Sequence, residues 1–316
     1  MTVYAITGVA GFIGSHLAES LIQQGHHIIG IDNFDPFYAK SIKERNLQNL
    51  NENTNFQFFS VDVSTEDFAL ALSNTPVDTV IHLSARAGVR PSLLFPQSYI
   101  QHDVEATVNV LETCRRLNIE NMIFGSSSSV YGNIPDLPYS ENIKINEPIS
   151  PYAAAKLSCE LFNHVYFSQY GLNITNLRFF TVYGPRQRPE MGIHKFTRLI
   201  DRGETIQMYG DGTSSRDYTY IDDIVEGVIR ACESVSGYNT YNLGNNSPVK
   251  LKDLISIISD KLGKEANIEQ LPMQPGDVDH TLADISVAQK DLGYQPKTSI
   301  GDGVEKFVDW YVKVKK

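Results

Sequence analysis

The most constraining feature of this sequence is a glycine-rich turn close to its start. Gly8–Gly14 joins a short apolar run, Val3–Thr7, to a segment whose apolar residues recur at helical spacing. A second apolar run, Ile28–Ile31, ends at the acidic residue Asp32. Glycines in such a turn let the backbone approach a pyrophosphate, and the helix after the turn presents unpaired N–H groups. The pattern therefore predicts the first βαβ unit of a dinucleotide-binding sheet.

Apolar, β-rich runs alternate with helical patterns through the first part of the chain. The further strand-like runs are Phe56–Val63, Thr79–Leu83, Met122–Phe124 and Ile174–Phe180. The longest helical patterns between them are Tyr99–Leu117 and Tyr152–Tyr170. This alternation predicts an α/β fold with a doubly wound parallel sheet of the Rossmann type, covered by helices on both faces.

The pattern changes beyond about residue 182, where loops rich in glycine, proline, arginine and aspartate appear. Helical patterns lie there near His194–Arg202, Asp222–Cys232, Leu251–Leu262 and Val304–Lys313. We expect this part to form a smaller, mixed α/β C-terminal lobe that binds the substrate. Because Tyr241–Leu243 reads as a strand that returns to the sheet, the expected boundary is discontinuous. Residues 1–181 with 219–245 would form the dinucleotide domain, and residues 182–218 with 246–316 the substrate lobe.

Composition excludes several classes of partner. The 316 residues carry a formal net charge of −10, which disfavours binding to a nucleic-acid backbone. No apolar run reaches the ~20 residues that span a bilayer, and the N-terminus lacks the pattern of a secretion signal. The three cysteines, Cys114, Cys159 and Cys232, form no Cys-x-x-Cys pair, which fits a reducing compartment and argues against a structural zinc site. We therefore expect a cytoplasmic protein with no membrane or nucleic-acid partner and no metal site.

The expected cofactor site lies at the carboxyl ends of the strands. Asp32, with Asn33 beside it, can accept hydrogen bonds from an adenosine ribose and would repel a 2′-phosphate, which favours NAD over NADP. Residues after the third and fourth strands would flank the adenine and the dinucleotide where it crosses the sheet. The candidate cofactor-binding residues are Gly8, Gly11, Phe12, Ile13, Gly14, Asp32, Asn33, Asp62, Val63, Leu83, Ser84 and Ala85.

A tyrosine and a lysine stand four residues apart at the start of the last long helical pattern. Tyr152 and Lys156 would share one helix face, where the lysine charge can favour a tyrosinate. That arrangement would let the tyrosine act as a base near neutral pH. The spacing by itself is weak evidence, because it also arises on ordinary exposed helices. A serine run within Gly125–Gly132 adds hydroxyl groups at the carboxyl end of a central strand.

These three motifs, in this order, resemble the extended short-chain dehydrogenase/reductase family over essentially the whole chain. The resemblance implies that Tyr152 is the catalytic base, and that Lys156 activates it and binds the nicotinamide ribose, so that both also contact the cofactor. It implies that Ser127, three residues before Val130, holds the reacting oxygen of the substrate, with Ser128 as a second catalytic and substrate-binding hydroxyl. The implied chemistry is oxidation of a sugar hydroxyl, with Tyr152 taking the proton and NAD⁺ the hydride.

The serine run also bears on the fate of the oxidised sugar. Relatives that dehydrate or decarboxylate their substrates carry acids where this chain has Ser128 and Ser129. Without such acids, the simplest outcome is return of the hydride to the opposite face of a rotated 4-keto intermediate. This outcome is 4-epimerisation of a UDP-sugar with no net use of NAD. Two alternatives are a net oxidoreductase that releases NADH and a non-catalytic NAD-sensing protein; the presence of Tyr152, Lys156 and Ser127 disfavours the second.

The segment Arg178–Met191 is similar to the corresponding segment of UDP-glucuronate 4-epimerases. The resemblance implies that Arg188 and Thr181 meet the C5 carboxylate of the sugar, a role that suits the fork of a guanidinium group. The alternatives for Arg188 are a solvated loop arginine or a ligand of the cofactor or phosphates. The expected substrate pair is UDP-glucuronate and UDP-galacturonate, with UDP-glucose/UDP-galactose 4-epimerase as the alternative and UDP-glucuronate decarboxylase as a less favoured one.

Three further substrate contacts rest on the same resemblance. Arg216 would bind the pyrophosphate, and Asp277 the ribose or phosphate region. Arg90, within residues 87–92, would bind a substrate carboxylate or phosphate, or else pair with a nearby acid. The family also implies a homodimer through the helices at Tyr99–Leu117 and Tyr152–Tyr170.

Overall fold

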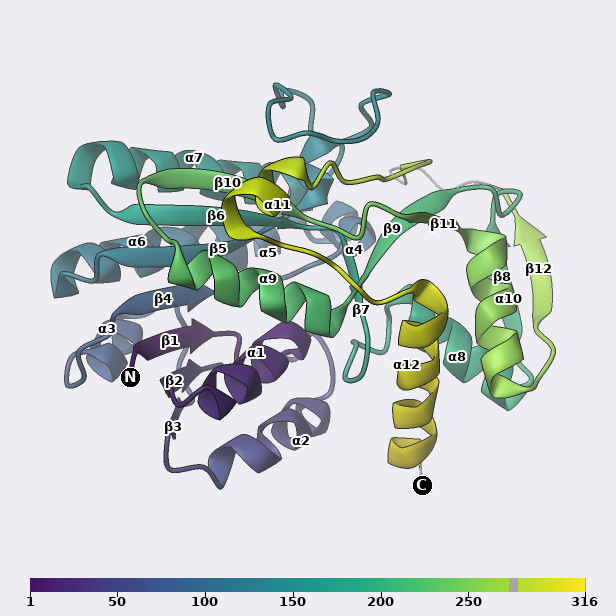
Figure 1. The fold of residues 1–316 in the computed structure, drawn as a ribbon, viewed down its shortest axis with the longest axis horizontal. Coiled ribbons are helices and arrows are strands. Elements are labelled where there is room, and N and C mark those ends of the chain that lie inside the picture. The colour runs from purple at the N-terminus through teal and green to yellow at the C-terminus, as the bar shows by residue number, and fades with distance from the viewer. Residues whose placement is uncertain (273–277, 316) are drawn as a thin grey trace.

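A seven-stranded parallel sheet forms the centre of the molecule, with strand order β10-β6-β5-β4-β1-β2-β3 (Figure 1). The computed structural model describes residues 1–272 and 278–315. The strands of the sheet are β1 (Val3–Thr7), β2 (His27–Ile31), β3 (Phe56–Phe59), β4 (Thr79–His82), β5 (Asn121–Ser127), β6 (Asn173–Phe179) and β10 (Tyr238–Leu243). The predicted doubly wound parallel sheet is confirmed, because the order reverses at β1, with β2 and β3 on one side and β4, β5 and β6 on the other.

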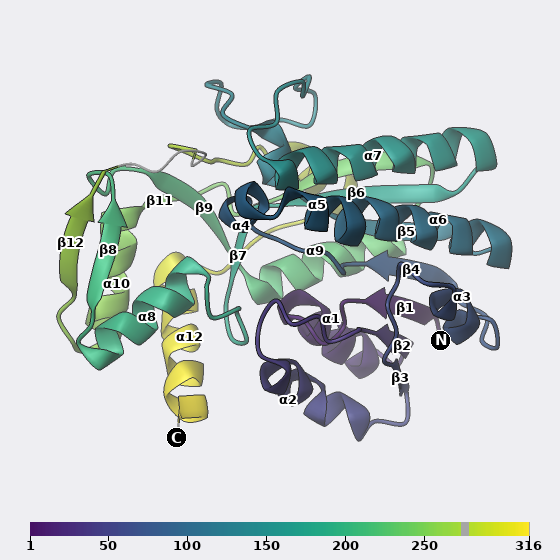
Figure 2. The ribbon, with the colours of Figure 1, turned by 180° about the vertical axis from the view of Figure 1, so that it is seen from behind.

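Helices cover both faces of this sheet (Figures 1 and 2). One face is covered by α1 (Phe12–Gln23), α2 (Lys40–Asn51) and α9 (Ile221–Glu233). The other is covered by α3 (Glu66–Leu72), α6 (Ala106–Leu117) and α7 (Pro151–Tyr170). Two buried clusters match these layers: Leu17 of α1 and Val228 of α9 belong to the first, and Val110 of α6 and Cys159 of α7 to the second. The strands are therefore apolar on both faces, as a parallel sheet between two helix layers requires.

Three predicted elements differ from the structure. The segment Tyr99–Leu117 is not one α-helix: α4 (Val89–Leu94) and α5 (Pro96–Tyr99) lead into a π-helical turn, η1 (Ile100–Glu105), before α6 begins. A π turn adds one residue to a helical turn, so the apolar periodicity on either side still reads as helix. Strand β3 ends at Phe59, so Asp62 and Val63 lie in the turn after it. Strand β5 extends through Ser127 into the serine run, which then forms the 3₁₀ turn η2 (Ser128–Tyr131).

The C-terminal part forms a smaller lobe beside the carboxyl ends of the sheet (Figure 1). Its strands are β7 (Thr181–Tyr183), β8 (Thr205–Tyr209), β9 (Ser215–Tyr220), β11 (Pro248–Lys250) and β12 (Asn267–Leu271), paired in the orders β11-β9-β7 and β12-β8. Its helices are α8 (Gly192–Arg202), α10 (Leu251–Leu262) and α12 (Ile300–Lys315), and α11 (Ser286–Leu292) packs near β10. The strand expected at Tyr241–Leu243 is β10, which pairs with β6. The lobe boundaries by residue number stay a prediction.

A buried ion pair ties the central strands to α7. Two of the three guanidinium nitrogens of Arg178, Nε and Nη2, donate to the Glu160 carboxylate, at 3.0 Å and 2.7 Å. The Ser126 hydroxyl donates to the same carboxylate at 2.5 Å, and Arg178 also donates to the hydroxyl of Tyr131 at 2.9 Å. Because a buried charge is tolerated only when paired and hydrogen-bonded, this network sets the position of β5 against α7 and β6.

Across residues 1–272 and 278–315, no helix combines the length and the apolar character that a membrane span needs. The longest of these helices, α7, carries charged residues that include Lys156 and Glu160.

Candidate active site

A cavity opens where the carboxyl ends of β1, β2, β4 and β5 face the start of the C-terminal lobe. Its volume is about 400 Å³, which falls in the range of small-molecule sites. All twelve candidate cofactor residues named from the strand ends line it, as do Tyr152, Lys156, Ser127 and Ser128. In open α/β sheets a ligand binds at the point where the strand order reverses. The cavity occupies that point, beside β1 and β4.

The glycine turn between β1 and α1 forms one wall of the cavity. Gly8 has a φ of +70°, and a Cβ there would lie 2.9 Å from the backbone nitrogen of Ser84. A Cβ on Gly14 would lie 2.4 Å from the carbonyl oxygen of Gly8. No side chain caps the N-terminus of α1 at Gly11. The turn therefore brings the uncapped N–H groups of α1, with their positive potential, to the cavity surface, where an anionic group can bind.

Asp32 follows β2 and is held at the base of the cavity. Its carboxylate accepts hydrogen bonds from the backbone nitrogens of Ala10, at 3.2 Å, and Phe34, at 2.8 Å. The ammonium group of Lys43 lies 3.4 Å from the same carboxylate and 5.1 Å from the ring of Tyr38. Lys43 was not predicted, because α2 reads in sequence as a polar surface helix. Only the tertiary structure places Lys43 in the wall of the cavity.

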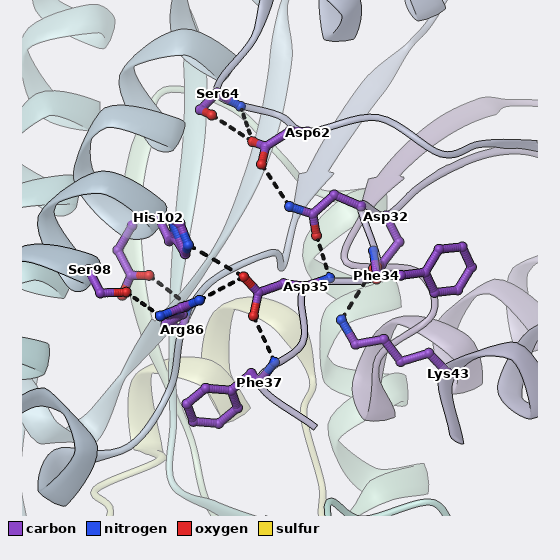
Figure 3. Close-up of polar contacts among 12 residues, drawn as sticks. Asp32, Phe34, Asp35, Phe37, Lys43, Asp62, Ser64, Arg86, Ser98 and His102 are labelled. Atoms are coloured by element: carbon purple, nitrogen blue, oxygen red, sulfur yellow. Dashed lines mark hydrogen bonds and ion pairs between the residues drawn. The ribbon is translucent and has the colours of Figure 1, made fainter. Parts of the chain in front are cut away.

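Asp62 stands on the opposite side of the same end of the cavity. It accepts hydrogen bonds from the side chain of Asn33, at 2.7 Å, and from the backbone and hydroxyl of Ser64, at 2.8 Å and 2.6 Å. Partial burial alone would raise the pKa of Asp62, but these hydrogen bonds outweigh it and hold the pKa below its usual value. The Asp62 carboxylate is therefore ionised at neutral pH, and its hydrogen bond orients Asn33. Figure 3 shows Asp62 with its partner Ser64.

A cluster around Arg86 joins two loops at the cavity rim (Figure 3). Arg86 donates to Asp35 at 2.8 Å and also to Ser98, and His102 lies 3.4 Å from the Asp35 carboxylate. Asp35 accepts a further hydrogen bond from the backbone of Phe37, at 2.9 Å. The loop after β2 is thus fastened to the loop after β4. Nothing in the sequence indicates this pairing, because residues 35 and 86 meet only when both strands lie in one sheet.

The N-terminus of α7 places the predicted tyrosine and lysine together. The Ser150 hydroxyl caps the helix by accepting from Ala153 at 3.1 Å, and Pro151 occupies the first turn, as is common at helix starts. Tyr152 and Lys156 lie one turn apart and both line the cavity. The buried Lys156 ammonium donates to the carbonyl oxygen of Gly125 at 2.8 Å. Lys156 therefore carries a buried positive charge on the helix face that it shares with Tyr152.

The serine run faces this pair from the end of β5. The Ser127 hydroxyl accepts from the backbone of Ser129 at 3.2 Å and donates to its hydroxyl at 3.1 Å. The residues Ser126 to Ser129 all line the cavity. Since neither Ser128 nor Ser129 can supply a proton as an acid would, the hydroxyls here can orient an oxygen but not protonate a leaving group.

Arg188 and Thr181 form the wall contributed by the C-terminal lobe. The Arg188 guanidinium lies 5.5 Å from the ring centroid of Phe37, and its Nε lies 2.9 Å from the Glu190 carboxylate. It also approaches the sulfur of Met191 at 3.5 Å. The fork is therefore held at the cavity edge by an aromatic face and an acid, in a position that accepts a carboxylate.

Two of the other candidate substrate residues, Arg90 and Arg216, do not line this cavity. Arg90 is not among the residues that line the cavity, and its guanidinium lies 5.2 Å from the ring of Tyr209. Arg216 is also not in the lining, and donates to the carbonyl oxygens of Ser215, at 3.0 Å, and Asp279, at 3.2 Å. Asp277 lies outside the described residues. The roles expected of these three residues stay predictions.

The chain is similar to known families and proteins over its whole length. The profile of the GDP-mannose 4,6 dehydratase family matches residues 5–307. The protein CapI of Staphylococcus aureus is 43% identical over 327 residues, an alignment that covers 98% of each chain. The chain belongs to the extended short-chain dehydrogenase/reductase family. The resemblance expected from the motifs is thereby confirmed.

Two further members of this family carry functional names. A UDP-glucuronate 4-epimerase of Thermodesulfobacterium geofontis is 39% identical over 313 residues, covering 98% of this chain and 96% of that protein. A crystal structure of UDP-glucuronic acid 4-epimerase from Bacillus cereus, in complex with UDP-glucuronic acid and NAD, is similar with a TM-score of 0.94. It is 37% identical and covers 99% of this chain and 100% of that one.

The close packing of Gly8 against Ser84 can be tested by substitution. Gly8→Ala should lower the free energy of unfolding by at least about 2 kcal/mol more than Gly203→Ala does. Both residues have a positive φ, +70° and +69°, so both substitutions carry the left-handed backbone cost of about 1–2 kcal/mol. Only Gly8→Ala adds a clash with Ser84, since a Cβ on Gly203 meets nothing within 4 Å. Urea unfolding measures both, and equal losses would contradict the clash.

Proposed function

We propose that the protein is an NAD-dependent 4-epimerase that interconverts UDP-glucuronate and UDP-galacturonate through a transient 4-keto intermediate. The observation that carries the proposal is the meeting of Tyr152, Lys156, the serine run and Arg188 in one cavity. The full-length similarity to the Bacillus cereus protein, whose crystals hold UDP-glucuronic acid and NAD, supports the same substrate and cofactor here.

The residues of the cavity fit NAD. The uncapped N-terminus of α1 suits the pyrophosphate, and the carboxylate of Asp32, at the end of β2, suits the adenosine ribose. Lys156 would hold the nicotinamide ribose. NAD⁺, when bound, supplies the acceptor for a hydride and afterwards its donor. The chain's own residues supply the proton transfers and the orientation of the sugar.

Tyr152 would take the proton of the sugar 4-hydroxyl and later return it. Lys156, on the same helix face, would supply a positive charge that stabilises the Tyr152 oxygen while it holds no proton. Ser127 would donate a hydrogen bond to the sugar oxygen as the carbonyl forms, with Ser128 beside it. Inversion at C4 would follow when the hydride returns to the opposite face of the rotated 4-keto sugar, and the proton that Tyr152 returns to O4 would complete the new hydroxyl.

Arg188 would recognise the acidic sugar. Its Nε lies 2.9 Å from the Glu190 carboxylate, and this ion pair orients the guanidinium at the cavity edge, where its terminal nitrogens can donate to a sugar carboxylate. Oxidation of glucuronate at C4 makes a β-keto acid, which loses CO₂ when the bond to its carboxylate aligns with the carbonyl π system. A carboxylate held by Arg188 and Thr181 would be kept from that alignment. The absence of an acid at Ser128 and Ser129 disfavours dehydration as well.

One assay tests the function directly. The purified protein is incubated with UDP-glucuronate and, separately, with UDP-glucose, without added reductant. We expect UDP-galacturonate from the first, no CO₂ and no stoichiometric NADH. Product from UDP-glucose only would favour the UDP-glucose 4-epimerase alternative. CO₂ release would identify a decarboxylase, and stoichiometric NADH a net oxidoreductase.

Replacing Arg188 should separate acidic from neutral sugar recognition. Arg188→Ala should raise KM for UDP-glucuronate at least about tenfold, because a charge-assisted hydrogen bond contributes about 1.5–3 kcal/mol. It should also increase the share of product that has lost CO₂. Arg188→Lys keeps the charge but loses the planar pair of N–H donors. Its KM for UDP-glucuronate should therefore lie between those of the wild-type protein and Arg188→Ala. Unchanged affinity and unchanged product ratio in Arg188→Ala would contradict the proposed role.

The proposal includes a cytoplasmic homodimer. The outer face of α7 exposes Leu161, Phe162 and Val165, with exposed fractions of 63%, 40% and 46%. A second copy could cover this apolar face, which adjoins α6. Cys114 and the two other cysteines are free and buried, which is consistent with a reducing compartment.

Negative charges introduced on this apolar face of α7 should prevent the dimer from forming. Leu161→Glu with Val165→Glu should convert a dimer into a monomer, because a carboxylate in an apolar interface is desolvated without a partner. Leu70→Glu, on the exposed surface of α3, is the matched control and should leave the dimer intact. Size-exclusion chromatography with light scattering measures the mass. A monomeric wild-type protein would contradict the homodimer.

A further inference from the structure

An ion pair joins two loops at the rim of the cavity (Figure 3). Nη2 of Arg86 donates to Oδ2 of Asp35 at 2.8 Å, and both residues line the cavity. Asp35 belongs to the loop after β2, and Arg86 to the loop after β4. In the sheet, β2 and β4 are the two neighbours of β1. The ion pair therefore spans the carboxyl end of β1, where the glycine turn Gly8–Gly14 begins.

Arg86 is held in one orientation from its own side of the cavity. Its backbone nitrogen donates to Oδ1 of Asp103, in η1, at 2.7 Å. Nη1 of its guanidinium donates to the hydroxyl of Ser98, in α5. His102, also in η1, lies 3.4 Å from the Asp35 oxygen that Arg86 contacts. Because separate nitrogens of the guanidinium have separate acceptors, the planar group is directed at Asp35.

The loop after β2 is held in shape by its own hydrogen bonds. The backbone nitrogen of Asp35 donates to Oδ1 of Asn33 at 2.9 Å, and Oδ1 of Asp35 accepts from the backbone nitrogen of Phe37 at 2.9 Å. These are two successive Asx turns. Phe34, within the first turn, has a φ of +53°, which a non-glycine residue adopts only where its surroundings enforce it. Oδ1 of Asp35 thus shapes the loop, while Oδ2 faces Arg86.

The same loop reaches the C-terminal lobe. The ring centroid of Phe37 lies 5.5 Å from the Arg188 guanidinium, within the range of a cation–π contact. Phe37 and Arg188 both line the cavity. The loop after β2 is therefore fastened on two sides, by the ion pair to the loop after β4 and by Phe37 to the C-terminal lobe.

The ion pair lies along the length of the proposed cofactor site. One end of that site is Asp32, after β2, and the other is Lys156, whose ammonium group contacts β5. The strands between β2 and β5 are β1 and β4. A dinucleotide that reaches both ends must cross the end of β1, which the Arg86–Asp35 pair spans. We therefore expect the two loops to separate before such a molecule can leave.

The reaction makes retention of the cofactor necessary. In a 4-epimerase, the hydride taken from C4 must return to the same sugar. Loss of the reduced cofactor between the two transfers would leave a 4-keto sugar without a hydride donor. A contact that keeps the two loops together during that interval protects the cycle.

We propose that Arg86 and Asp35 are positioning residues whose ion pair acts as a clasp, which retains NAD by keeping the two loops together. The need for retention rests on the epimerase function proposed above, whereas the clasp itself requires only that NAD binds in the cavity. Neither residue has to touch the sugar or the reacting atoms. Breaking the ion pair from either side should therefore have the same effect, which is faster release of NAD.

The test measures the release of NAD with no sugar nucleotide present. The protein is loaded with radioactively labelled NAD and mixed with a large excess of unlabelled NAD, and the label that stays bound is counted over time. Arg86→Gln and Asp35→Asn should each speed the loss of label at least about fivefold, because a partly buried, charge-assisted pair is broken. The double variant should exceed the faster single variant by no more than about twofold, since both substitutions remove the same interaction.

Two comparisons separate the clasp from other roles. Arg116→Gln breaks a more exposed ion pair of similar length, 2.9 Å to Glu66, and should leave the release rate unchanged. Asp35→Asn keeps an oxygen that can accept from the backbone of Phe37, so it carries the test if Arg86→Gln does not fold. Faster release from Arg86→Gln with unchanged release from Asp35→Asn would overturn the proposal, because Arg86 would then act on NAD directly. Unchanged release from both, or effects that multiply in the double variant, would overturn it as well.

Turnover supplies a second readout. With the UDP-sugar substrate present, both single variants should release more free NADH per turnover than the wild-type protein does, measured by absorbance after the protein is filtered out. A protein that turns over no UDP-sugar would contradict the proposed function. The exchange of labelled NAD would still decide whether the clasp exists, because it needs no sugar.

Discussion

The burial of the Lys156 ammonium is the constraint on which the site depends. Only 4% of this residue is exposed, so its charge needs acceptors within the protein. It donates to the carbonyl oxygen of Gly125 and lies 4.8 Å from the ring of Phe124. Both partners belong to β5, so the contact fixes the register of α7 against the sheet. Tyr152, one turn earlier on α7, and Ser127, two residues after Gly125, then face the same cavity.

An ion pair that starts from the same helix, α7, supports this arrangement. Glu160, one turn after Lys156, binds both Arg178 of β6 and the hydroxyl of Ser126. The serine run is thus held between a lysine on one side and an acid on the other. Charged residues inside a protein are costly unless their partners are well placed. The consequence of that burial is a site whose catalytic hydroxyls have little freedom to move.

The parts of the fold that a sequence can predict are those encoded by local rules. The Gly8–Gly14 turn and the acid Asp32 were identifiable because their chemistry depends on neighbours in sequence, and the structure places them in the cavity. The helical pattern predicted at Tyr152–Tyr170 is α7, which begins at Pro151 in the structure. The helical pattern predicted at Tyr99–Leu117 is helical throughout in the structure, but the sequence did not show the π turn at Ile100–Glu105, because such a turn keeps the apolar pattern.

The remaining site residues could not be read from the chain. Lys43 meets Asp32 across 11 residues and Arg86 meets Asp35 across 51, and neither residue stands in a motif. By itself, the sequence determined the parallel α/β sheet, the glycine turn and the tyrosine–lysine face, since periodicity and side-chain chemistry suffice for each. Only the tertiary structure decided which charges surround them. Burial and distance control electrostatic coupling, and both arise when β4, β5 and α7 pack together.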